Sequence, residues 1–169
     1  MSDLERLVAT SSQTVGPFFH FALTARPDGR MIDRFPPGGE AMTLRIAVRD
    51  GDGQPVADAM IELWQAGVFG RMPTAADGTC EFETVRPAGR GDDRAAHINV
   101  CLFARGLLRQ IHTRIYFDGD AALIGDPVLG LVPEDRRRSL LATSSREQPG
   151  LWRFDIHLQG PQETVFFDV

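Results

Sequence analysis

The chain has 169 residues, of which 43% are hydrophobic and 24% charged, so it can fold as one globular domain with a buried core. Its net charge of −5 argues against nucleic-acid binding, which usually needs a basic face. No apolar run approaches the ~20 residues of a membrane span, and the N-terminus lacks the basic start and apolar run of a secretory signal. We therefore expect a cytoplasmic protein with no membrane partner, in which Cys80 and Cys101 are reduced and buried.

Residues 1–41 show little hydrophobic periodicity and are rich in proline and glycine, including the run PPGG at 36–39. This composition predicts an irregular arm. A long segment without regular structure is uncommon in a compact domain unless it serves a purpose, so we expect the arm to wrap around something. The remaining residues, 42–169, are expected to form the folded domain.

Period-two alternation dominates the domain. In MTLRIAVR (42–49), Met42, Leu44, Ile46 and Val48 fall on one face and polar or small residues on the other, as in a strand with one buried face. Asp-Gly turns occur between several such segments. Seven short strands predict an all-β fold, an antiparallel β-sandwich or barrel; the other six are 59–66, 79–86, 95–104, 109–117, 151–159 and 164–169.

One short helix is predicted over 133–143. Pro133 is tolerated in a first helical turn, and the acidic pair Glu134 and Asp135 suits a helix N-terminus.

The strand at 95–104 carries His97 and Asn99, which point to the same face because they are two residues apart. Two imidazoles at this spacing could bind one metal ion, but an asparagine amide is a poor ligand for a transition metal. The other histidines lie on different segments. Considered alone, the pair is interpreted as two half-buried polar groups that share hydrogen bonds with their neighbours. Arg105, at the end of the same strand, is either a carboxylate-binding group or a solvated turn residue.

Five stretches in order resemble the intradiol ring-cleavage dioxygenases. The most characteristic are SSQTVGPFFHF (11–21), DGDGQPVADAMIELWQA (50–66) and AAHINVCLFARGLLRQIHTRIYFDGD (95–120); FGRMPTAADGTCEFETVRPAG (69–89) and WRFDIHLQGPQETVFFDV (152–169) complete the set. The resemblance covers most of the chain. It implies the β-sandwich of that family, related to the transthyretin-like fold.

The heteromeric members of this family that cleave protocatechuate contain homologous α and β chains. In them, the β chain holds Fe(III) through two tyrosines and a His-x-His pair. His97 matches the first of these histidines and Asn99 stands at the second. The chain has a single tyrosine, Tyr116, so it cannot supply two phenolate ligands. The resemblance therefore implies an α chain that binds no iron itself.

The same resemblance implies four substrate-binding residues, which would complete the pocket of the partner β subunit. Thr14, Gly16 and Pro17 match the arm motif that reaches the β site, and Arg105 matches a residue near the carboxylate of protocatechuate. The implied assembly is a higher-order α–β oligomer. The alternative hypothesis is a metal-free, transthyretin-like binding or structural module with no enzymatic role.

Overall fold

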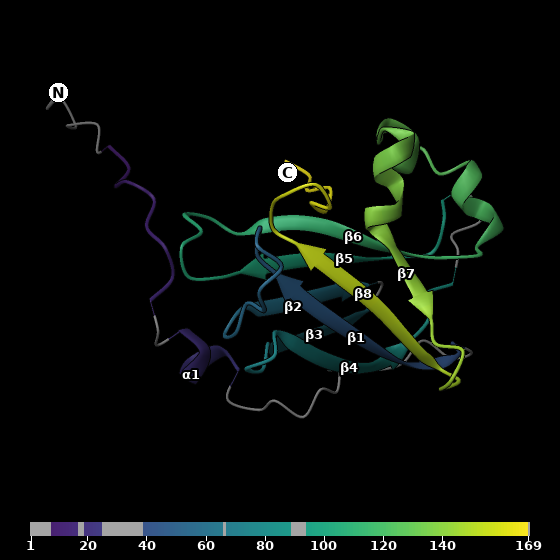
Figure 1. The fold of residues 1–169 in the computed structure, drawn as a ribbon, viewed down its shortest axis with the longest axis horizontal. Coiled ribbons are helices and arrows are strands. Elements are labelled where there is room, and N and C mark those ends of the chain that lie inside the picture. The colour runs from purple at the N-terminus through teal and green to yellow at the C-terminus, as the bar shows by residue number, and fades with distance from the viewer. Residues whose placement is uncertain (1–7, 17–18, 25–38, 66, 89–93, 169) are drawn as a thin grey trace, which may run out of the picture.

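The computed structural model describes residues 8–16, 19–24, 39–65, 67–88 and 94–168 (Figure 1). The regular structure of the described residues consists of eight strands, one short α-helix and three 3-10 helices. The strands are β1 (Ala41–Arg49), β2 (Met60–Gln65), β3 (Val68–Pro73), β4 (Thr79–Val85), β5 (His97–Phe103), β6 (Ile111–Phe117), β7 (Leu141–Ser144) and β8 (Leu151–His157).

The strands form two layers that are joined at one side. The order is β3-β2-β5-β6-β7-β8-β1-β4, so the short strand β7 links the β3-β2-β5-β6 layer to the β8-β1-β4 layer. Figure 1 shows β8, β1 and β4 crossing in front of the other layer. Most neighbouring strands are antiparallel, as predicted, but β1 pairs with β8 and β6 with β7 in parallel. The fold is thus an all-β sandwich that approaches a closed barrel.

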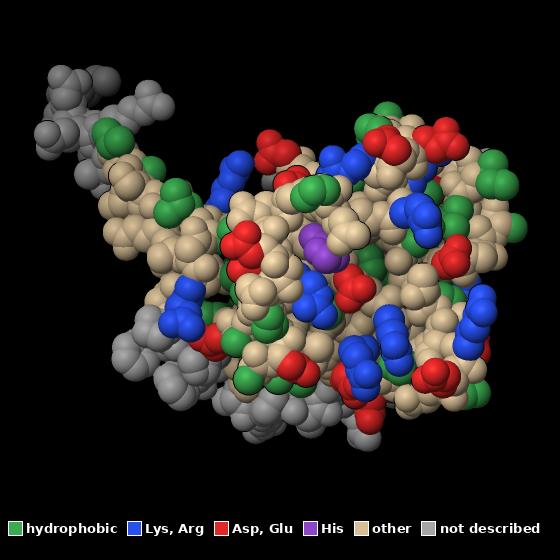
Figure 2. Space-filling model, in the orientation of Figure 1, with side chains coloured by type: hydrophobic (Ala, Val, Ile, Leu, Met, Phe, Trp, Pro, Cys, Tyr) green, Lys and Arg blue, Asp and Glu red, His purple; other side chains and the backbone are tan. Residues whose placement is uncertain are grey.

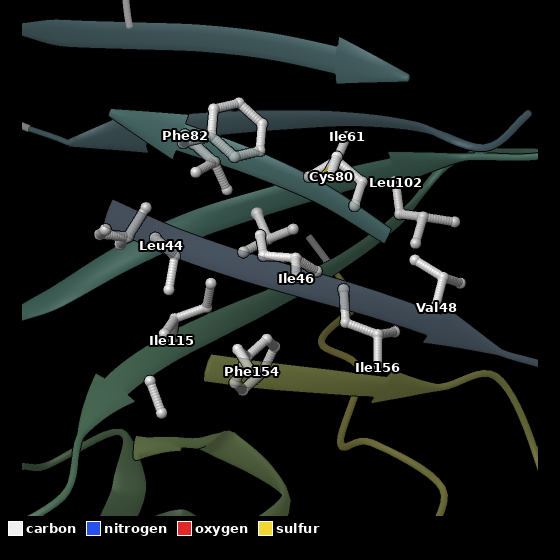
Figure 3. Close-up of a cluster of buried hydrophobic side chains, with 14 of the residues drawn as sticks. Leu44, Ile46, Val48, Ile61, Cys80, Phe82, Leu102, Ile115, Phe154 and Ile156 are labelled. Carbon is white, nitrogen blue, oxygen red and sulfur yellow. The ribbon is translucent and has the colours of Figure 1, made fainter. Parts of the chain in front are cut away.

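The main hydrophobic core lies between the two layers, where the alternating faces of the strands meet (Figure 3). Leu44, Ile46 and Val48 of β1 are fully buried, as their period-two pattern predicts. They face Ile61 and Ile98 of the opposite layer across a cluster that includes Phe82, Leu102, Ile115, Phe154 and Ile156. Large, fully buried β-branched and aromatic side chains of this kind supply most of the driving force for folding.

A second cluster covers the outer side of β5 and β6. Tyr116 packs there against Leu129, Val132 and Leu140 from the segment that holds the 3-10 helices. These helices are η1 (Ala121–Ile124), η2 (Leu129–Leu131) and η3 (Glu134–Leu140). The segment therefore shields one end of the outer face of the β5/β6 layer.

The structure corrects several sequence-based element boundaries. The helix predicted over 133–143 is a 3-10 helix that ends at Leu140, because residues 141–144 pair with β6 and β8 as strand β7. The strand predicted over 164–169 is wrong. Its backbone contacts divide among different elements: Thr164 N–H donates to His157 O and Phe167 N–H to His112 O, with only an isolated bridge at Phe167. Strand β3 was not predicted.

The predicted arm is only partly described. It contains α1 (Phe19–Leu23), a single turn that was not foreseen, and strand β1 begins at Ala41. The Leu23 carbonyl oxygen lies 3.5 Å from Nη1 of Arg71 in β3, which places α1 against the edge of the β3-β2-β5-β6 layer. In Figure 1 residues 8–16 run along the outside of the domain, next to the turn that joins β5 to β6.

The distribution of surface charge and the burial of the two cysteines are typical of a globular protein. Acidic and basic side chains alternate on the face shown in Figure 2, with no extended basic patch. Within the described ranges, no helix is long and apolar enough to cross a membrane. Cys80 and Cys101 are both buried and free, as predicted, and burial raises the pKa of the Cys80 thiol to about 12.

Candidate functional site

His97 and Asn99 lie on the outer face of β5, the side opposite the main core. His97 is half-buried; its Nδ1 lies 3.0 Å from the Ala95 carbonyl oxygen, and its ring is tilted against Tyr116 with 5.6 Å between centroids. Asn99 is exposed, opposite Trp64 of β2 and Arg114 of β6. The shared face is the one that their spacing predicts, but the two side chains differ in environment.

Tyr116, the single tyrosine, is fully buried beside His97 and is not available as a phenolate. Its hydroxyl donates to Oδ1 of Asp126 at 3.1 Å and accepts from Nη1 of Arg114 at 3.5 Å. Burial raises the pKa of Tyr116, and the negative charge of Asp126 acts in the same direction. The tyrosine is therefore a neutral hydrogen-bond donor that helps fix the 3-10 segment.

Asp126 is the centre of this buried network. Its carboxylate accepts the N–H groups of Ala95 at 3.0 Å, Val128 at 3.0 Å and Leu129 at 2.8 Å, in addition to the hydroxyl of Tyr116. Burial alone would raise the pKa of Asp126, but these donors favour the charged form and the pKa is lowered. The network ties the 3-10 segment to the start of β5.

The residues on this face do not match the ligands of a ferric site. Within the part of the chain that the structure describes, no three His, Cys, Asp or Glu side chains gather as a metal-binding group. At the two positions that resemble iron histidines, one histidine stands beside an exposed asparagine, and the adjacent tyrosine is committed to Asp126. This donor set does not fit Fe(III), and no catalytic step is assigned to iron in this chain.

A second candidate region lies at the end of β5, where the chain turns toward β6. The turn is closed by a hydrogen bond from Leu107 N–H to Ala104 O at 3.2 Å, and Gly106 adopts a φ of +94°. A side chain would be strained at this φ, so glycine suits the position. Arg105 lies within the turn with 57% of its side chain exposed.

The predicted arm meets this turn. Oγ1 of Thr14 accepts a hydrogen bond from Gly106 N–H at 2.7 Å, although the residues are 92 positions apart. Gly16 follows in the arm, and its carbonyl oxygen accepts the Phe19 N–H at 3.3 Å as α1 begins. Of the four predicted substrate-binding residues, the structure places Thr14 and Gly16 on the arm and Arg105 beside the contact, whereas Pro17 lies outside the described residues.

The structure adds Asp58, which sequence reasoning missed. Its Oδ2 lies 3.4 Å from Nη2 of Arg105. The antiparallel register explains the contact. Met60 of β2 is paired with Phe103 of β5, so Asp58, two residues before Met60, lies next to Arg105, two residues after Phe103. No local pattern in the sequence signals this pair, because the contact depends on the register of two separate strands.

The described features define a class of protein: a β-sandwich with an exposed arginine at the meeting point of an arm and a strand end, and without the phenolate ligands of a ferric site. No model of a protein family matches the chain. Its sequence is 39% identical to the protocatechuate 3,4-dioxygenase alpha chain of Burkholderia cepacia, with 96% of this chain and 98% of the relative covered. It is 37% identical to the alpha chain of the same name from Pseudomonas putida, with 98% of each covered.

Two further similarities are weaker. The protocatechuate 3,4-dioxygenase beta chain of Burkholderia cepacia is 29% identical over 76% of this chain and 68% of its own length. Catechol 1,2-dioxygenase from Pseudomonas arvilla C-1 has a similar structure, with a TM-score of 0.61 and 25% identity over 79% of this chain and 56% of that one. The chain belongs to the intradiol ring-cleavage dioxygenase family, among the protocatechuate 3,4-dioxygenase alpha chains.

Proposed function

We propose that the chain is the α subunit of a heteromeric protocatechuate 3,4-dioxygenase, and that it completes the substrate pocket of a homologous β subunit. In this proposal Fe(III) is held by the β subunit and none is bound by this chain. The assembly breaks the ring bond between the two hydroxylated carbons of protocatechuate, adds one atom of O2 to each of these carbons and forms 3-carboxy-cis,cis-muconate. The reduced state of two buried thiols fits a cytoplasmic location.

The observation that carries the proposal is the 2.7 Å hydrogen bond between Thr14 and Gly106. It joins the arm, expected to reach the partner, to the turn that presents Arg105, expected to meet the substrate. Two segments remote in sequence are thereby gathered at one end of the sandwich. This arrangement supports a composite pocket in which each subunit supplies one wall.

Arg105 has the chemistry to recognise the ring carboxylate of protocatechuate. A guanidinium donates two parallel hydrogen bonds to a carboxylate and stays charged at every physiological pH. Its 57% exposure leaves donors accessible to a ligand that arrives from outside the chain. This chain would thus select the substrate by charge, while the chemistry at the ring takes place on the β subunit.

Gly16 supports an external role for the arm. A Cβ atom added at this position would meet no other atom of the described chain within 4 Å, and its backbone does not adopt a positive φ. Nothing in the described part of the chain therefore calls for a glycine. A glycine is explained if the arm backbone comes close to a substrate or a partner chain, and Pro17 would stiffen the same motif.

Exposed apolar side chains occur on the same two segments. Val8 of the arm is 91% exposed and Leu108 of the β5–β6 turn is 63% exposed. Isolated exposed apolar residues are common, so they add only modest support. In the proposed assembly the β subunit covers both, and α–β pairs associate further into a higher-order oligomer.

Co-expression with a homologous β chain that carries His-x-His and two loop tyrosines tests the proposal. We expect a stable complex that cleaves protocatechuate, whereas each chain purified alone is inactive. The proposal fails if this chain alone cleaves protocatechuate. It also fails if the chain remains monodisperse and ignores the β chain, a result that favours the metal-free transthyretin-like module.

A further inference from the structure

We propose that Asp58 is a positioning residue that holds the guanidinium of Arg105 in the orientation that receives the substrate carboxylate. The inference rests on the proposed function and adds to it a residue outside the motifs that suggested the site. Asp58 itself would not touch the substrate. It would act through Arg105, with which it forms an ion pair at 3.4 Å.

The two partners differ in how firmly the fold holds them. Arg105 belongs to a surface turn and is 57% exposed, whereas the Asp58 side chain is 24% exposed. Asp58 N–H donates to the carbonyl oxygen of Thr74 at 3.2 Å, and Ala59 N–H donates to Oγ1 of Thr74 at 2.9 Å. Thr74 is only 5% exposed. The backbone that carries the Asp58 carboxylate is therefore anchored to buried structure, and the more exposed arginine is the partner that becomes fixed.

The backbone of Asp58 does not by itself explain an aspartate. Its φ of +64° is the single positive φ of a non-glycine residue in the described part of the chain. Glycine adopts this conformation without strain, and asparagine tolerates it about as well as aspartate. The turn would accept either residue, so what aspartate adds is a negative charge directed at Arg105.

The geometry of the pair leaves room for a ligand. Asp58 approaches Arg105 through Nη2 at 3.4 Å, and a guanidinium carries five N–H donors in a planar fork. The remaining N–H groups can donate hydrogen bonds to a second carboxylate that arrives from the exposed side. An arginine already restrained loses less rotamer freedom when the ligand binds, which favours binding. The negative charge of Asp58 opposes this gain, but water screens that repulsion at an exposed site.

Thr14 complements this arrangement on the backbone. Its hydrogen bond to Gly106 N–H at 2.7 Å fixes the residue next to Arg105, while Asp58 restrains the side chain. Three segments thus converge on one arginine: the arm, the turn before β2 and the turn after β5. This convergence is expected around a group that must be preorganised.

The test compares Asp58→Gly and Asp58→Asn in the assembled α–β complex, with protocatechuate and with catechol, which lacks the carboxylate. Gly removes the acceptor and relieves the positive φ, and Asn keeps the shape and the turn while it removes the charge. We expect Asp58→Gly to raise KM for protocatechuate about threefold to tenfold, with kcat almost unchanged, because only ligand capture is affected. Asp58→Asn should have a smaller effect of the same kind, and catechol kinetics should stay constant.

Two controls give the test its specificity. The Arg105→Ala variant and the double variant Arg105→Ala/Asp58→Gly should have the same KM for protocatechuate, because Asp58 acts only through Arg105. Glu81→Gln breaks another exposed ion pair, to Arg45 at 2.6 Å on the opposite layer, and should leave both substrates unaffected.

The outcomes separate this inference from the proposed function. If Arg105→Ala impairs protocatechuate selectively but Asp58→Gly does not, the positioning role is wrong and the proposed function stands. Equal effects of Asp58→Gly on both substrates would show a merely structural role, and a lower KM for protocatechuate would show that Asp58 competes with the ligand. If Arg105→Ala affects both substrates equally, the carboxylate role of Arg105 fails, and the inference fails with it.

Discussion

Replacement of Arg105 by alanine is the perturbation that most directly probes substrate recognition. The side chain is 57% exposed and contacts Asp58 at 3.4 Å, so its loss leaves no fully buried group without a partner. We therefore expect the fold and the assembly with the β subunit to persist. Any loss of activity should then reflect recognition rather than stability.

The size of the effect follows from the strength of a charge-assisted hydrogen bond. Hydrogen bonds to charged groups contribute about 1.5–3 kcal/mol, and about 1.4 kcal/mol corresponds to a factor of ten in binding. Exposure of Arg105 and its existing ion pair with Asp58 both reduce the net contribution. We expect KM for protocatechuate to rise about tenfold, at the lower end of this range, with little change in kcat.

Steady-state kinetics of the complex with protocatechuate and with catechol measures this effect. Catechol lacks the carboxylate, so its KM should not change. Arg109→Ala is a matched control: Arg109 lies on the same turn, is 78% exposed and has an ion pair of 3.9 Å with Asp168. Arg109→Ala should affect neither substrate. An equal rise in KM for both substrates in Arg105→Ala would refute carboxylate recognition by this residue.

Three further predictions concern the arm and the buried network. Thr14→Val removes the acceptor for Gly106 N–H, and we expect weaker protocatechuate binding in the complex, severalfold in KM, with Thr14→Ser as the control that restores it. Asp126→Ala leaves the Ala95 and Leu129 N–H groups and the Tyr116 hydroxyl without their acceptor in a buried site, so urea unfolding should show a loss of about 3–5 kcal/mol; a loss below about 1 kcal/mol would contradict the role of the network. Because the pKa of Asp126 is lowered on folding, its charged form contributes stability above the unfolded pKa of about 3.9, and that contribution is lost as pH falls through the folded pKa. The difference in unfolding free energy between the native chain and Asp126→Asn should therefore shrink on acidification below pH ~4, and a constant difference would contradict the assignment.

The strands of the central layers could be predicted from sequence because their side-chain pattern is local. Leu44, Ile46 and Val48 alternate with polar or small residues, and the same period recurs in β8. Strand β3 shows no such alternation; it includes Gly70 and ends at Pro73. The four-residue strand β7 depends on pairing with β6 and β8 rather than on its own composition. The apolar segment after Thr164 has the composition of a strand but finds no continuous partner.

The candidate site, like the fold, could be predicted only in part from the sequence. The count of one tyrosine, and the shared face of His97 and Asn99, could be worked out from the sequence. The contact of Thr14 with Gly106 could not be predicted from the sequence, since it joins residues 92 positions apart. Asp58 was missed because its position beside Arg105 follows from the β2–β5 register, which no single segment encodes.

In the proposed assembly this chain recognises the substrate, whereas the iron ion is held by the β subunit. The most direct test is the iron content per α–β pair in complexes that carry His97→Ala or Tyr116→Phe in this chain. We expect the same iron content and the same visible absorption as in the unmodified complex, because in the proposed assembly neither side chain is a ligand. A proportional loss of iron in either variant would show that this chain supplies an iron ligand.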